Sequence, residues 1–178
     1  MRPNRGVFGI VGKEGTNCAQ QIIAALKEQQ HRGTKHWGVA ISGDDEIACF
    51  TPKGPVSALL DEKIYDIQGD IGIGHVSSCD PQPIAGYSKH GPFAVCFDGF
   101  NPAADSQRID LMARGAFFAS QEDVEVIAGF ISHGFDIISG IENAIRLTVG
   151  PCAMLVLTRD AIYAARDDRG WRPLVIGK

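Results

Sequence analysis

The segment Gly6-Val7-Phe8-Gly9-Ile10-Val11-Gly12 constrains the fold more than any other part of this sequence. It is apolar and β-prone, with a glycine at every third position, and it predicts a buried strand. Glycine inside a strand costs stability, so its repetition indicates close approach by another backbone or by a ligand. The spacing G-x-x-G-x-x-G is not the dinucleotide-binding pattern G-x-G-x-x-G, and we therefore expect no phosphate-binding loop.

Length, charge and cysteine usage bound the class of protein. The 178 residues suit a single domain spanning residues 1–178, and the net charge of −4 gives no support to a nucleic-acid or anionic-membrane surface. Every apolar run is far shorter than the roughly 20 residues of a membrane span. The five cysteines are odd in number and form no C-x-x-C pair, which is typical of reduced thiols in a cytoplasmic protein. We expect no cofactor, no metal, no nucleic-acid partner and no membrane.

The order of local patterns predicts an α+β domain. A helix is expected over 19–26, capped by Thr16 or Asn17, because its apolar residues recur with helical spacing. Further helices are expected near 105–114, from 122 onward and over 136–147, and strands over 38–42, 47–50, 71–76, 93–97, 152–157 and 161–166. Residues 43–45 and the pair Asp98-Gly99 are expected to be turns, and 77–86 irregular. Interleaved hairpins and helices favour antiparallel sheets with helices outside.

Three polar clusters stand at the ends of these elements, where functional residues often lie. They are His31-Arg32-Gly33, Gly74-His75-Val76 and Asp98-Gly99. Each has a plainer interpretation when it is taken alone: a structural histidine, a surface or ion-pair arginine, and a turn. The histidines lack a helical metal-binding spacing, and no carboxylate pair accompanies them.

Taken together, these clusters and their neighbours resemble class II glutamine amidotransferases. The similar segments are Gly6-Val7-Phe8-Gly9-Ile10, His31-Arg32-Gly33 with Gly38-Val39-Ala40, 69–76, Gln82-Pro83 and Asp123-Val124-Glu125-Val126. The segment 166–177, which contains Arg166-Asp167 and Gly170-Trp171-Arg172-Pro173-Leu174, resembles the amidophosphoribosyltransferase branch of that family. The resemblance covers essentially the whole chain.

This resemblance implies a fold and a reaction. The fold is that of N-terminal-nucleophile hydrolases, a four-layer αββα sandwich of two antiparallel sheets between helices, and we expect Gly6 to Gly12 at the centre of one sheet. The reaction is hydrolysis of the glutamine side-chain amide, with ammonia passed to a synthase domain. In the family a cysteine immediately before the first glycine is the nucleophile, its own α-amine is the base, and an Asn-Gly pair forms the oxyanion hole.

The sequence departs from the family at most of these places. Arg5 occupies the nucleophile position, behind Met1 to Asn4, and Asp98 with Gly99 occupies the oxyanion-hole positions. Ser77 replaces the arginine that holds the glutamine carboxylate, and the loop from 77 to 81 is shortened. Asp123 matches the substrate-binding aspartate. The candidate substrate-binding residues are thus Asp123, Ser77, Arg32 and His75.

Three hypotheses follow. The leading one is a degenerate glutaminase domain that acts as a structural, regulatory or ligand-binding module, with Arg5 paired to Asp98 or Asp123. The alternative is a rewired amide hydrolase that releases ammonia from glutamine with Cys79, beside His75, or Cys96 as nucleophile. The third is a working glutamine amidotransferase with its motifs misaligned.

The resemblance also bears on partners. The family's phosphoribosyltransferase domain is not expected in this chain, which suggests a separate synthase or phosphoribosyltransferase subunit. A bare sheet edge favours homo- or hetero-oligomers, because an exposed edge invites pairing.

Overall fold

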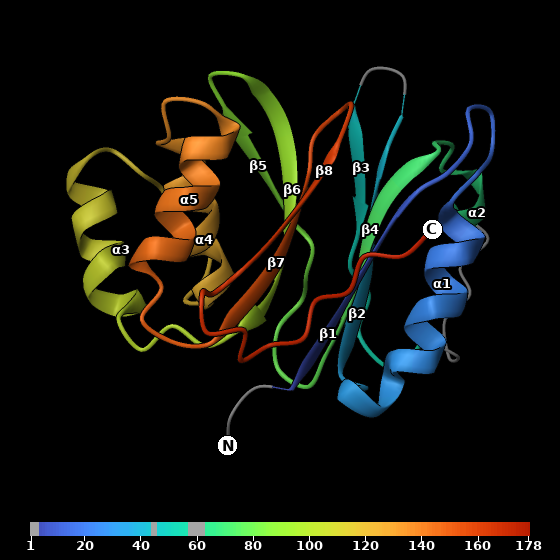
Figure 1. Ribbon diagram of the computed structural model, residues 1–178, viewed down its shortest axis with the longest axis horizontal. Helices are drawn as coiled ribbons and strands as arrows, with labels where there is room; N and C mark the ends of the chain where they lie inside the picture. Colours follow the sequence, from blue (N-terminus) through green and yellow to red (C-terminus); the bar gives the residue numbers. More distant parts are fainter. Residues whose placement is uncertain (1–3, 44–45, 57–62) are drawn as a thin grey trace.

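Two four-stranded antiparallel sheets face each other in the computed structural model, which describes residues 4–43, 46–56 and 63–178 (Figure 1). The first sheet has the spatial order β1 (Arg5–Val11), β4 (Ile71–Ser77), β2 (His36–Ser42) and β3 (Ile47–Phe50). The second has the order β5 (Ile84–Ser88), β6 (Gly91–Gly99), β7 (Cys152–Leu157) and β8 (Ile162–Arg166).

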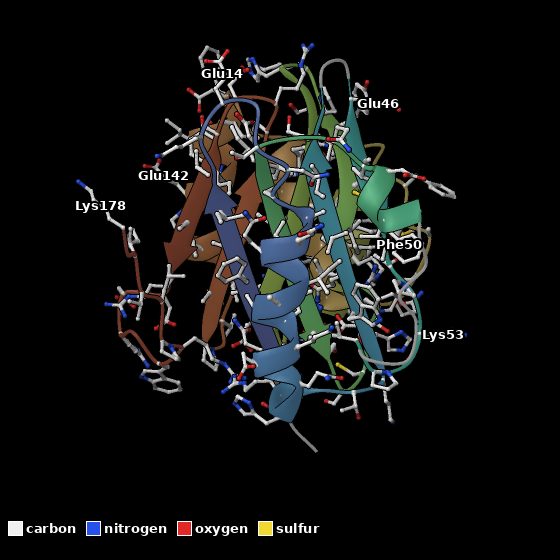
Figure 2. The ribbon with its side chains drawn as sticks, turned by 90° about the vertical axis from the view of Figure 1, so that its right-hand side faces the viewer. Glu14, Glu46, Phe50, Lys53, Glu142 and Lys178 are labelled. Atoms are coloured by element: carbon white, nitrogen blue, oxygen red, sulfur yellow. The ribbon has the colours of Figure 1, made fainter. Side chains whose placement is uncertain are left out.

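Helices cover both outer faces, so the four-layer αββα sandwich is confirmed (Figure 1). The helix α1 (Ala19–Glu28), which continues into a 3₁₀ turn (Gln29–Arg32), lies across the first sheet, as Figure 2 shows from its own side. The helices α4 (Asp123–Ser132) and α5 (Ile137–Leu147) cover the second sheet, and α3 (Ala104–Ala113) packs against α4. A short helix, α2 (Lys63–Asp66), precedes β4.

Glycines in β4 explain how closely α1 approaches the first sheet. A Cβ atom at Gly72 or Gly74 would lie only 2.7 or 2.5 Å from the side chain of Ile22. The apolar face of α1 is buried in this contact. The N-cap position is Cys18, which forms no side-chain cap, and Asn17, one residue earlier, accepts the backbone N–H of Ala19 at 2.9 Å. This packing fixes the end of the helix, and with it Arg32, beside the first residues of β1.

Three expectations about the sheets are wrong. β1 lies at the edge of its sheet rather than at its centre, because β4 is its strand neighbour on one side and no described strand lies on the other. Asp98 and Gly99 form no turn, since they pair with Ala153 and Cys152 of β7. The ladder with β7 thereby overrides the local turn preference. Residues 84–88, within and just beyond the stretch expected to be irregular, form the edge strand β5.

The expected turn at 43–45 includes residues outside the described part of the chain. In the part that is described, no helix is both long enough and apolar enough to cross a membrane.

Candidate active site

One end of the space between the sheets collects the polar residues that the sequence singled out. Arg5 begins β1, Ser77 ends β4, and Asp98 and Gly99 end β6. Arg32 reaches the same place from the end of the 3₁₀ turn. Arg5, Ser77 and Asp98 are all buried here, and even the long side chain of Arg5 has only 2% of its surface exposed.

Arg5 and Asp80 form a bidentate ion pair at the centre of this cluster. Nε of Arg5 lies 2.8 Å from Oδ1 of Asp80, and Nη2 lies 2.9 Å from Oδ2. The remaining guanidinium nitrogen, Nη1, donates to the carbonyl of Gly99, and the guanidinium carbon lies 5.8 Å from the ring centroid of Phe97. Arg5 therefore ties the first sheet to the second. The expectation that it pairs with Asp98 or Asp123 is wrong.

Asp80 is fully buried and surrounded by donors. Besides Arg5, it accepts hydrogen bonds from Ser77 Oγ at 2.7 Å, Gln82 Nε2 at 2.7 Å and Cys79 Sγ at 2.8 Å. Burial by itself raises the pKa of Asp80, but the hydrogen bonds and charge of Arg5 outweigh it and hold that pKa well below its usual range. Burial lowers the pKa of Arg5, but the hydrogen bonds and charge of Asp80 raise it by more, so the pKa of Arg5 is raised overall. Both groups are thus charged at any physiological pH.

Asp98 has two arginine neighbours of its own. Nη2 of Arg32 donates to Oδ2 of Asp98 at 3.1 Å, and Nε of Arg172 lies 3.5 Å from Oδ1. Nε of Arg32 also donates to the carbonyl of Arg5 at 2.8 Å. Burial raises the pKa of Asp98, and these two arginines oppose that rise. The ionic partners of Asp98 are therefore Arg32 and Arg172, whereas Arg5 pairs with Asp80.

Asp123 lies at the start of α4, where its Oδ2 accepts the backbone N–H of Asn101 at 2.9 Å. Burial raises the pKa of Asp123, and the nearby charge of Arg5 acts in the opposite direction. The carboxylate is half-buried at the edge of the cluster. Its role as a substrate-binding residue stays a prediction.

The pairing of Cys79 with His75 that a rewired enzyme would require does not form in the described chain. Both ring nitrogens of His75 are buried without a hydrogen-bond partner in the described chain, and burial lowers the pKa of His75 to about 3. The thiol of Cys79 donates to Asp80 instead, and burial together with this bond raises its pKa. Cys96 is fully buried, which raises its pKa well above the ordinary value. Neither cysteine has the lowered pKa of an activated thiolate.

Sequence reasoning missed three residues that organise the cluster. Asp80 was given no role, although its place in the shortened loop after β4 was a usable signal. Gln82 and Arg172 both belong to segments that carried the family resemblance, but neither was given a role there. Their contacts join segments that are far apart in the sequence, and periodicity does not reveal such contacts.

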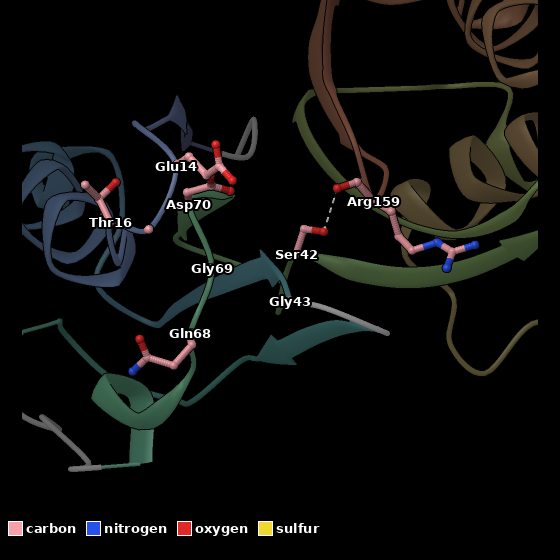
Figure 3. A pocket seen from close by; sticks show the side chains of 9 residues that line it. Glu14, Thr16, Ser42, Gly43, Gln68, Gly69, Asp70 and Arg159 are labelled. Carbon is pink, nitrogen blue, oxygen red and sulfur yellow. Dashed lines mark hydrogen bonds between the residues drawn. The ribbon is translucent and has the colours of Figure 1, made fainter.

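The cluster offers no evident metal site. No group of three or more His, Cys, Asp or Glu side chains in the described ranges is arranged to hold a metal ion. A separate cavity of about 350 Å³ lies at the other end of the first sheet (Figure 3). Glu14 and Asp70 are among the residues that line it, whereas the guanidinium of Arg159 points away from them (Figure 3). It shares no residue with the cluster around Arg5.

Residues 71–178, more than half of the chain, match the model of the glutamine amidotransferase domain. The chain belongs to this family. The fold and the sequence relatives agree with the class II amidotransferases, and the resemblance inferred from the motifs is confirmed to that extent.

The curated relatives of this amidotransferase domain are enzymes. This chain is 32% identical over 188 residues to the amidophosphoribosyltransferase of Methanocaldococcus jannaschii, and the match covers 97% of this chain and 40% of that protein. It is 34% identical over 190 residues to amidophosphoribosyltransferase 2, chloroplastic, of Arabidopsis thaliana, covering 99% and 33%. The chain thus spans about two fifths of the length of the first of these relatives, and about a third of the second.

The structure of glutamine phosphoribosylpyrophosphate amidotransferase from B. subtilis, complexed with ADP and GMP, superposes on this domain with a TM-score of 0.84. The sequence identity is 27%, and the match covers 94% of this chain and 38% of that one. The sandwich described above is therefore the fold of a known glutamine amidotransferase.

Proposed function

We propose that this amidotransferase domain does not hydrolyse glutamine and acts as a non-catalytic structural, regulatory or ligand-binding module. The observation that carries the proposal is the buried Arg5–Asp80 pair at the position where the family resemblance places the nucleophile. A guanidinium is protonated at any relevant pH and cannot attack an amide. The pair holds that cation in place with two hydrogen bonds from Arg5 to Asp80 and one to Gly99.

The second support is the charge at the oxyanion position. The family resemblance places an amide donor where this chain has Asp98, and a carboxylate repels the negative charge that develops during amide hydrolysis. Asp98 is buried between Arg32 and Arg172, so both arginines already have an anionic partner within the domain. Loss of one oxyanion donor typically lowers the rate by about 10²–10³-fold. Loss of a nucleophile lowers it by about 10⁶-fold in another hydrolase class.

The proposal extends to partners and compartment. Several relatives with the same domain are amidophosphoribosyltransferases, so we place the module beside a separate synthase or phosphoribosyltransferase subunit of purine synthesis. All five cysteines are free, which agrees with a reducing, cytoplasmic setting.

An ammonia-release assay at millimolar glutamine tests the loss of hydrolysis, with wild type and Cys79→Ala compared under the same conditions. We expect no turnover above the buffer rate in either protein. Turnover that disappears in Cys79→Ala would establish the rewired enzyme and overturn the proposal. Turnover that survives in Cys79→Ala would overturn it as well, because the active site would then lie elsewhere.

A further inference from the structure

One side of the sandwich is open, and a single segment crosses it. The edge strands β1 and β8 belong to different sheets, and each has a described strand neighbour on one side alone. They lie near each other on the same side of the molecule. Residues 171–178, here called the crossing segment, run from the foot of β8 across this side toward the first sheet (Figure 1). In the perpendicular view Lys178 stands away from the body (Figure 2).

The crossing segment has few attachments. No hydrogen bond joins residues 172–178 to the rest of the described chain. Leu174 packs on the apolar cluster between the sheets, on which Val7 of β1 and Ile162 of β8 also pack. Beyond it, Val175 and Ile176 are 87% and 85% exposed. The other attachments are the hydrogen bond from the backbone N–H of Trp171 to Asp167 Oδ1 at 3.3 Å, at the start of the segment, and the ion pair between Arg172 and Asp98.

Of the two ion pairs of Asp98, the one with Arg172 is the weaker. Nε of Arg172 and Oδ1 of Asp98 are both buried, yet they lie 3.5 Å apart and neither has a hydrogen-bond partner. Arg32, in contrast, reaches Oδ2 of Asp98 at 3.1 Å and is fixed by a second bond to the backbone of Arg5. If Arg172 leaves, Asp98 keeps a charged partner and no isolated buried carboxylate results. Separation of Arg172 from Asp98 therefore disturbs little else.

We propose that the crossing segment is a movable strap, latched to the body by Arg172 on Asp98. Its opening withdraws Leu174 from the apolar cluster between the sheets, on which Val7 and Ile162 also pack, and leaves the edge of β1 accessible for pairing. It also exposes Asp98 to solvent. The strap thus controls access to the open side of the sandwich and to the cluster around Asp98. This inference is independent of whether the domain hydrolyses glutamine.

Native-state proteolysis with thermolysin tests the latch, with mass spectrometry to identify cleavage between residues 174 and 176. A protease binds several residues on each side of the bond that it cuts, so cleavage here is faster when Arg172 and Leu174 have left the body, and its rate reports local opening. We expect Arg172→Met to raise this rate about fivefold, the effect of losing one weak ion pair, at an unchanged urea midpoint of global unfolding. Leu174→Ala is expected to raise the rate as well, because it removes the apolar packing of the segment on the body.

Arg32→Met is the matched control, because it removes the other arginine from Asp98 without touching the crossing segment. At the urea concentration that gives equal global stability, its cleavage rate at 174–176 is expected to equal that of wild type. An unchanged rate in Arg172→Met would show that packing alone holds the segment and would overturn the proposal. Equal acceleration in Arg32→Met would also overturn it, since general loosening of the cluster would then explain the result.

Discussion

The side chain of Gln82 forms hydrogen bonds with both the backbone N–H and the backbone carbonyl of Phe97. Its Oε1 accepts the N–H of Phe97 at 2.6 Å, and its Nε2 donates to the carbonyl at 3.3 Å. The same Nε2 donates to Asp80 Oδ2 at 2.7 Å. A buried side-chain amide therefore continues the pairing of β6 beyond the end of β5, and it connects the second sheet to the ion pair of Arg5.

Replacement of this amide is expected to lower stability. Gln82→Leu leaves the buried N–H and carbonyl of Phe97 without their partner, which costs about 1–3 kcal/mol in the free energy of unfolding. Urea unfolding measures the change. Gln20→Leu, on the exposed face of α1, is the matched control and should have little effect. A loss no larger than that of the control would mean that the Gln82 contacts contribute nothing.

The Arg5–Asp80 pair is expected to show strong coupling. Arg5→Met leaves a buried carboxylate without its counter-charge, which costs about 3–5 kcal/mol, and Asp80→Leu leaves an equally unpaired guanidinium. The double variant Arg5→Met/Asp80→Leu removes both charges and should lose much less than the sum of the single losses. Urea unfolding of all four proteins gives the coupling energy. Arg114→Met, at an exposed arginine, serves as the control, and additive losses would contradict the buried pair.

His75 is expected to make stability depend on pH. Its pKa in the folded protein is lowered to about 3 by burial, whereas the unfolded chain titrates near 6.5. Below pH 6.5 the unfolded state binds the extra proton, so the free energy of unfolding falls by about 1.4 kcal/mol per pH unit as pH decreases toward 3.

The variant His75→Gln removes this titration. Its unfolding free energy, measured between pH 6.5 and 4.5, should decline less steeply than that of wild type. His31→Gln, at an exposed histidine, should retain the wild-type slope. Identical slopes in wild type and His75→Gln would show that the imidazole is not buried in its neutral form.

Gly33 is expected to tolerate no side chain. A Cβ atom there would lie 2.2 Å from the carbonyl carbon of Ser77 and 2.5 Å from the backbone nitrogen of Ser78. Since both are backbone atoms, Gly33→Ala must push the end of the 3₁₀ turn away from β4, at a cost of about 1–3 kcal/mol. Thermal unfolding measures the effect against Gly177→Ala, where a Cβ meets no atom within 4 Å. Equal melting temperatures for the two variants would refute this close contact.

The sequence by itself determined the layers of this protein and the identity of several residues in its central cluster. Helical spacing placed α1, and the glycine-spaced apolar segment placed β1, because both signals are periodic and local. The order of the motifs identified the family, and the alignment that it implies predicts Arg5 at the nucleophile position.

Only the tertiary structure decided which residues and strands pair with one another. Asp80 rather than Asp98 or Asp123 pairs with Arg5, because the loop after β4 turns its carboxylate into bidentate geometry while Arg32 and Arg172 engage Asp98. Asp98 and Gly99 lie in a strand because β7 supplies hydrogen-bond partners that no local pattern reveals. β1 lies at a sheet edge because strand order depends on contacts between distant segments. Periodicity specifies how a segment folds, whereas the choice among several opposite charges requires the geometry of all the segments that meet there.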